Sequence, residues 1–62
     1  MFRVIVDYKT AKHEACFARI QVVGDLIQMP KGFDKVVYSV LLMAYDENEP
    51  NAIIWVKDGD RL

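Results

Sequence analysis

The feature that most constrains the fold is an apolar run near the middle of the chain, from Lys35 to Tyr45. It is the longest stretch without a turn signal, so it must lie at the centre of any core that the chain can build. A chain of 62 residues forms one domain, close to the size at which a single core is only marginally stabilising. We therefore expect one small domain, residues 1–62, built around this run.

Two conformations of the run are open. Val36 and Val37 favour a strand, because β-branched side chains lose χ1 freedom in a helix but pack well on a pleated surface. A helix over residues 34–45 is the alternative, because apolar residues recur at three-and-four spacing and Asp34 could cap the first turn. The charges near both ends of the segment have the wrong sign for the helix dipole. The strand is therefore favoured.

Three further segments have strand patterns. Phe2 to Lys9 alternates apolar and polar residues, and Ala52 to Lys57 is a short β-branched run that contains the tryptophan. Residues 15–29 fit a hairpin whose two-residue turn is Gly24-Asp25, since glycine supplies a positive φ at no steric cost. In this hairpin Val23 would face Leu26. Residues 10–13 are interpreted as a loop, and residues 29–32 as a turn.

Five apolar runs separated by turn signals predict an all-β fold, a five-stranded meander curled into a small barrel or a bent sheet. If the central run is helical instead, the fold is α+β, with one helix at residues 34–45 packed on a four-stranded antiparallel sheet. Either architecture leaves more apolar positions than one core face can absorb.

The alternation of side chains along each strand shows which apolar residues are left outside the core. If Val36, Tyr38 and Val40 face inward, then Val37, Leu41, Met43 and Tyr45 face outward. The last run likewise leaves Ile53 and Trp55 outside when its alternate residues are buried. An exposed patch rich in Tyr, Trp and aliphatic residues is typical of a protein interface.

We predict a non-catalytic protein–protein interaction module, a homodimer or a subunit or regulator of a larger protein. Its interface consists of the outward apolar residues Leu41, Met43, Tyr45, Ile53 and Trp55. The acidic loop residues Asp46, Glu47 and Glu49 form a charged rim that steers association rather than anchoring it.

Catalysis and metal binding are not expected. The chain has one histidine and one cysteine, His13 and Cys16, and positions three apart on a strand point to opposite faces. A structural zinc site needs four Cys or His ligands, and no glycine-rich phosphate loop is present. We therefore predict no cofactor, no metal, no small-molecule substrate and no enzymatic activity.

Single-strand nucleic-acid binding is the alternative function, because small β-barrels bind such strands with basic and aromatic side chains on one face. The candidate patch consists of Arg3, Phe17, Arg19 and Lys31. The net charge of −1 gives no overall basic field, which makes this function the less favoured one.

The expected location is the cytoplasm. No window is apolar enough to span a membrane, and the N-terminal segment carries Asp7 within its apolar part and has no small-residue cleavage site. A lone cysteine makes no internal disulfide, which suits a reducing compartment.

Overall fold

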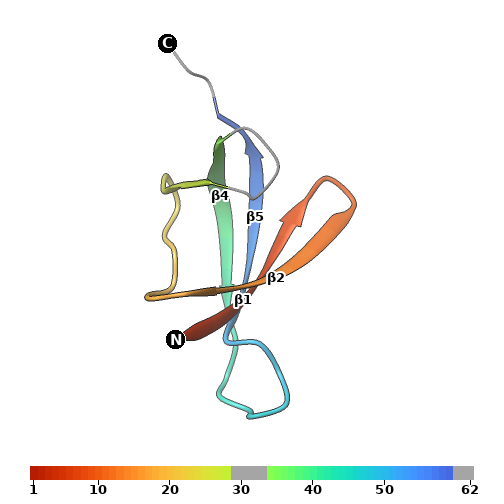
Figure 1. Cartoon of the computed structure of the whole chain (residues 1–62), viewed down its shortest axis with the longest axis vertical. Helices are drawn as coiled ribbons and strands as arrows, with labels where there is room; N and C mark the ends of the chain where they lie inside the picture. The colour runs from red at the N-terminus through yellow and green to blue at the C-terminus, as the bar shows by residue number, and fades with distance from the viewer. Residues whose placement is uncertain (29–33, 60–62) are drawn as a thin grey trace.

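The computed structural model describes residues 1–28 and 34–59, and it places them in one mixed five-stranded sheet (Figure 1). The strands are β1 (Phe2–Tyr8), β2 (Ala11–Phe17), β3 (Leu26–Gln28), β4 (Asp34–Leu42) and β5 (Ala52–Asp58). Their order in the sheet is β2-β1-β5-β4-β3, with β1 and β5 parallel and the other pairs antiparallel.

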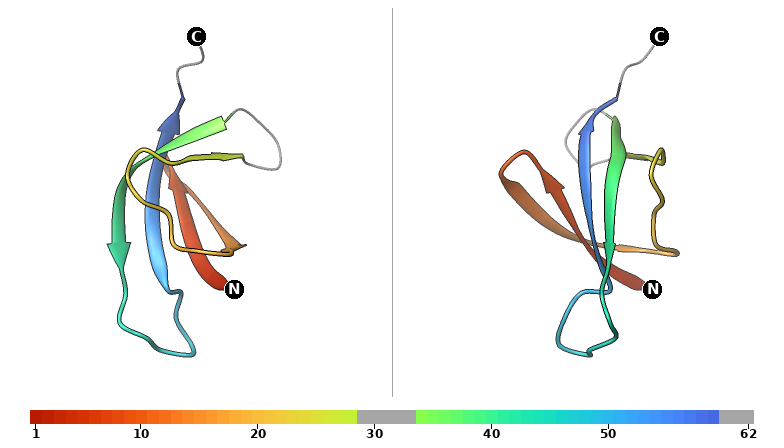
Figure 2. Two further views of the ribbon diagram at one scale, coloured as in Figure 1. Left: turned by 90° about the vertical axis from the view of Figure 1, so that its left-hand side faces the viewer. Right: turned by 180° about the vertical axis from the view of Figure 1, so that it is seen from behind.

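The sheet bends strongly, so that it forms a half-barrel whose inner face is the core side (Figure 2). This confirms the all-β class and the curled sheet that the sequence predicts. The predicted meander order is wrong, because β2 and β3 lie at opposite edges of the sheet and β1 pairs with β5 in parallel. The helical alternative for residues 34–45 is wrong, because Asp34–Leu42 is a strand and no helix occurs in the described residues. Consequently, no described helix is available to cross a membrane.

Period-two alternation on three adjacent strands builds the core. Val4 and Val6 on β1, Ile54 on β5 and Val37 on β4 expose no surface, and burying a side chain of this size contributes about 1.5–3 kcal/mol. Ile27, Ala52 and Val56 complete the buried set. The parallel register pairs Val6 with Ile54, so the two central strands supply the middle of the core.

A β-bulge in β4 reverses the alternation that the sequence predicts for its first half. Val37 pairs with Val56 and Ser39 pairs with Trp55, so Tyr38 is an extra residue opposite no partner of its own. Val37 is therefore fully buried, although alternation placed it outside. Beyond the bulge Leu41 faces outward, as expected.

The predicted hairpin of residues 15–29 is wrong. Its first half is split, because Ala11–Phe17 is a strand that pairs with β1 across a two-residue turn at Lys9 and Thr10. Its second half pairs with β4 instead, since Leu26 lies opposite Val36 rather than Val23. The loop predicted for residues 10–13 is therefore also wrong in extent, because β2 begins at Ala11 and only the turn at Lys9 and Thr10 remains. The turn predicted for residues 29–32 lies outside the described residues.

The turn signal at Gly24 is real but is shifted by one residue. The N–H of Asp25 donates to the carbonyl of Val22 at 3.1 Å, which closes a turn over residues 22–25. Gly24 has a φ of 99°, and its N–H donates to the carbonyl of Val37 at 2.9 Å. The turn thus places the residues that follow it, which form β3, beside β4.

Gly24→Ala is expected to destabilise the fold by about 1–3 kcal/mol, because a side chain at this φ strains the backbone. A Cβ here would meet no atom within 4 Å, so the cost is one of conformation alone. Urea unfolding measures it. Val23→Ala, at an exposed position in the same turn, is the control and should change stability little. Equal costs for the two variants would contradict the strained-turn account.

Candidate protein interface

The outer face of the sheet carries apolar side chains across its three central strands. Ile5 on β1, Ile53 on β5 and Leu41 on β4 form one row, because Ile53 pairs with both of the others. Trp55 follows on β5, beside Ser39 and Asp7. We call Ile5, Leu41, Ile53 and Trp55 the outer stripe.

The outer stripe is only partly covered. Leu41 is 49% exposed, and Ile5, Ile53 and Trp55 are half-buried by their neighbours in the sheet. No second layer of described residues packs over this face, since all described strands belong to the one sheet. Antiparallel sheets usually turn polar residues to the solvent side. Here three central strands present aliphatic and aromatic groups instead.

Three of the five predicted interface residues belong to the stripe, and two lie beyond it. Met43 and Tyr45 follow the end of β4, where the Met43 N–H donates to the Asn51 carbonyl at 3.0 Å. Met43 is partly buried, whereas Tyr45 is 82% exposed. Ile5 completes the stripe, although the sequence did not single it out. Ile5 lies on the face of β1 opposite Val4 and Val6, but the local pattern does not show that β1 adjoins β5.

The predicted acidic rim lies in the loop between β4 and β5, and Arg3 ties this loop to the outer face. Its guanidinium donates from Nη2 to the backbone carbonyls of Glu47 at 3.4 Å and Glu49 at 2.7 Å. Asn51 adds a second tie, accepting from the Arg3 N–H at 2.9 Å. The exposed side chains of Asp46, Glu47 and Glu49 therefore sit at one end of the stripe.

The three described residues of the alternative nucleic-acid patch, Arg3, Phe17 and Arg19, are not brought together. Arg3 faces outward and lies 3.5 Å from the Glu14 carboxylate, while Phe17 faces inward opposite Phe2. Arg19 lies in the loop after β2 and pairs with Asp25 at 2.9 Å. The fourth residue, Lys31, lies outside the described residues.

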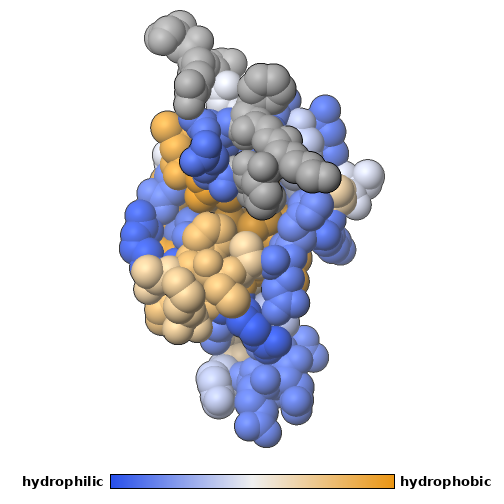
Figure 3. Space-filling model, viewed as in Figure 1, coloured by the Kyte–Doolittle hydropathy of each residue, from blue (hydrophilic) through white to orange (hydrophobic). Residues whose placement is uncertain are grey.

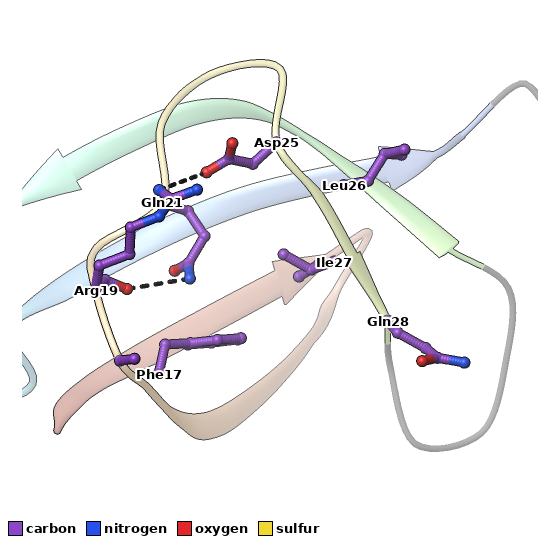
Figure 4. Close-up of a pocket in the computed structure, with 8 residues that line it drawn as sticks. Phe17, Arg19, Gln21, Asp25, Leu26, Ile27 and Gln28 are labelled. Atoms are coloured by element: carbon purple, nitrogen blue, oxygen red, sulfur yellow. Dashed lines mark hydrogen bonds and ion pairs between the residues drawn. The ribbon is translucent and has the colours of Figure 1, made fainter.

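A hollow of about 320 Å³ lies beside this loop, between the end of β2 and β3 (Figure 4). Phe17 and Ile27 point into it, and Arg19 and Asp25 close one side with their ion pair. The Arg19 guanidinium donates to Asp25, and this lowers the pKa of the Asp25 carboxyl, with the Val22 N–H as the second donor.

Gln21 lies beside the Arg19–Asp25 ion pair at the wall of this hollow and is buried (Figure 4). Its Nε2 donates to the Arg19 carbonyl at 3.1 Å, which fixes the orientation of the amide. Its Oε1 accepts no hydrogen bond and has essentially no exposed surface. A ligand in the hollow would not reach this oxygen, so the unpaired acceptor is a cost to the loop rather than a binding group.

A second hollow, of about 380 Å³, is apolar and lies on the inner side of the sheet. It is lined by Ile20, Gln21, Val22, Val23, Val40 and Leu42. The sequence pattern does not predict it, because residues 18–25 are interpreted there as part of a hairpin and form a loop instead. Elsewhere, an apolar area covers the start of β1, the end of β2 and the following loop, where Met1 and Phe2 are exposed (Figure 3).

A polar cluster stabilises the opposite end of the sheet from the acidic loop. The ammonium of Lys35, a buried residue, donates to Asp58 at 2.9 Å and lies 4.5 Å from the centre of the Tyr8 ring. The Tyr8 hydroxyl also donates to Asp58, at 3.0 Å. The Lys35 and Tyr8 hydrogen bonds together hold the pKa of the Asp58 carboxyl below its ordinary value.

Asp58→Asn should lower stability at neutral pH and flatten its pH dependence. A carboxyl whose pKa is lowered by folding contributes stability above its unfolded pKa, about 3.9, and this stability is lost as the pH falls toward the folded pKa. Urea midpoints between about pH 6 and pH 2.5 measure the effect. Glu47→Gln, in the exposed loop, is the control. If the stability of the variant depends on pH as steeply as that of the wild type, this role of Asp58 is contradicted. Some pH dependence remains in both proteins, because folding also lowers the pKa of the Asp25 carboxyl.

His13 and Cys16 lie on opposite faces of β2, since His13 faces Val6 and Cys16 faces Arg3. No group of three or more His, Cys, Asp or Glu side chains gathers within residues 1–28 and 34–59 in a way that could hold a metal ion. Comparisons with protein-family models, curated proteins and solved structures give no match.

Proposed function

We propose that the chain is a protein–protein interaction module and that the outer stripe is its binding surface. The observation that carries the proposal is the uncovered row of Ile5, Ile53 and Leu41, with Trp55 beside it, on the outer face of the three central strands. Aromatic and aliphatic groups held on rigid strands make better anchors than groups on loops. The apolar inner hollow, by contrast, is lined largely by the loop of residues 18–25.

The partner that fits is a protein with an apolar patch bordered by basic side chains. The acidic loop supplies the charge at one end of the stripe, and the carboxylates of Asp46, Glu47 and Glu49 form no ion pair within the described residues. Exposed charges of this kind raise the rate of association more than the final affinity. We therefore propose that the apolar contact holds the complex and that the acidic rim steers it, in the cytoplasm.

Leu41→Asp should reduce partner binding at least roughly tenfold, because a carboxylate in the middle of an apolar interface loses its hydration without gaining a partner. The tagged chain captures its partner from the native host, and titration with the purified partner gives the affinity. Leu42→Asp is the matched control, since Leu42 is more exposed than Leu41 but lies on the opposite face.

Loss of binding in Leu41→Asp with retention in Leu42→Asp supports the outer stripe. The reverse result would assign binding to the inner hollow and contradict the proposal. Raising the salt concentration should slow association and leave dissociation nearly unchanged, as rim charges act through steering.

A further inference from the structure

Strand β2 is an edge strand with one unpaired side. It ends the sheet order, and among the described strands it packs against β1 alone. β2 lies on the side of β1 that is away from β5, and no other described strand pairs with its outer side (Figures 1 and 2). An edge of this kind is a template for another strand.

The residues that offer free backbone groups can be assigned from the hairpin geometry. Tyr8 and Ala11 flank a two-residue turn, and flanking residues of such a turn form a hydrogen-bonded pair. Bonded and non-bonded pairs then alternate along the ladder. Lys12, Glu14 and Cys16 therefore direct their N–H and C=O groups away from β1.

The edge lacks two of the devices that usually prevent strand pairing, a proline and a β-bulge. It contains no proline, and the register between β1 and β2 runs without a bulge over all seven residues of β2. The edge at the opposite side of the sheet differs, because β3 spans only three residues. The only charges on β2 are those of Lys12 and Glu14, and both side chains lie on the outer face.

These two charges make β2 complementary to itself. We propose that β2 pairs antiparallel with β2 of a second copy of this chain, with His13 opposite His13 of the second copy. In this register Lys12 lies opposite Glu14 of the second copy, and Glu14 lies opposite its Lys12. Both are hydrogen-bonded pairs of the new antiparallel ladder, so the ion pairs and the backbone hydrogen bonds form at the same positions.

The two registers that differ from it by two residues are less favourable. A shift in one direction puts Glu14 opposite Glu14 of the second copy, and a shift in the other puts Lys12 opposite its Lys12. Like charges directly opposite each other are destabilising. The proposed dimer joins two half-barrels into one continuous sheet of two-fold symmetry, with both outer stripes on the same side. It is independent of the outer stripe, and it would make the module bivalent.

Light scattering over a range of concentrations tests the dimer directly. The wild-type chain should change from monomer to dimer as the concentration rises, and Lys12→Glu should weaken the dimer roughly tenfold, because both symmetric pairs become repulsive. The double variant with Lys12→Glu and Glu14→Lys should recover much of the lost affinity, since it restores opposite charges across the dimer. Full recovery is not expected, because within each chain the exchange places like charges beside Arg3 and Asp7. Circular dichroism confirms that each variant is folded.

Disulfide trapping tests the register. His13→Cys combined with Cys16→Ser should give a covalent dimer on mild oxidation, because position 13 faces itself as a non-bonded pair with closely spaced Cα atoms. Ala11→Cys with Cys16→Ser is the control. The two copies of position 11 lie roughly 13 Å apart along the strands, too far for a disulfide.

A folded wild-type chain that stays monomeric up to millimolar concentration would overturn the proposal. So would a dimer that Leu41→Asp abolishes and Lys12→Glu leaves intact, because that dimer would use the outer stripe. A dimer that Lys12→Glu weakens and Leu41→Asp leaves unchanged supports the edge pairing, whatever the outcome for the outer stripe.

Discussion

Replacing Ile54 with alanine is expected to unfold most of the chain at room temperature. Ile54 exposes no surface, and it packs in the middle of the sheet between Val6 on β1 and Val40 on β4. Losing a buried side chain of this size costs about 2–5 kcal/mol. A core in a domain this small rarely supplies more than about 3–5 kcal/mol of stability. Far-ultraviolet circular dichroism and urea unfolding give the measurement.

Ile53→Ala is the matched control for this substitution. The two residues are adjacent on β5, but Ile53 lies on the outer face and is only half-buried. Its replacement should cost less than half as much, and the folded signal should persist. If both variants lose the same stability, the inner and outer faces of β5 are assigned wrongly.

Val37→Lys is expected to prevent folding, whereas Val36→Lys should be tolerated. Val37 is fully buried because of the bulge, and burying an unpaired ammonium costs several kcal/mol, which exceeds the stability of a chain this size. Val36 lies on the outer face opposite Lys57, where its side chain is partly exposed. The two variants are compared by circular dichroism and by the dispersion of their proton NMR spectra.

The comparison distinguishes a bulged β4 from a regular one. In a strand without the bulge, alternation from Val40 back along the chain would bury Tyr38 and Val36 and expose Val37. Val36→Lys would then be the variant that unfolds. That result would contradict the bulge and, with it, the arrangement of the first half of β4.

The strands with the clearest local patterns are also those that the sequence predicts best. Val4 and Val6 alternate with charged or outward residues on β1, and Ile54 alternates with Ile53 and Trp55 on β5. In both strands the predicted faces agree with the observed burial. The β-branched content of the central run was likewise a correct indication of a strand. Period-two alternation is sufficient where a strand is regular and one of its faces is buried.

Two features escaped prediction for physical reasons. The bulge at Tyr38 inserts one residue into β4, and a single insertion reverses every inward and outward assignment on one side of it. The hairpin around Gly24 is consistent locally, but Leu26 and Ile27 pair with β4 rather than with Val22 and Val23. Neither the bulge nor the pairing of β3 with β4 can be predicted from the local sequence pattern.

The candidate site was predicted in part. Leu41, Ile53 and Trp55 were identified from alternation and share the outer face, whereas Ile5 joins them only because β1 and β5 pair in parallel. That pairing connects residues about fifty positions apart, and nothing in a local pattern specifies it. The same holds for Arg3, whose contacts with Glu47 and Glu49 link β1 to the loop between β4 and β5.

The most direct test of the outer stripe uses the one tryptophan of the chain, Trp55. Incorporating 5-fluorotryptophan gives a single fluorine NMR signal that reports the surroundings of this side chain and no other. On titration with the captured partner protein, the signal should shift and lose its response to solvent, because the indole leaves water for an apolar interface. A complex that forms while the signal keeps both its position and its solvent response would contradict the proposed interface.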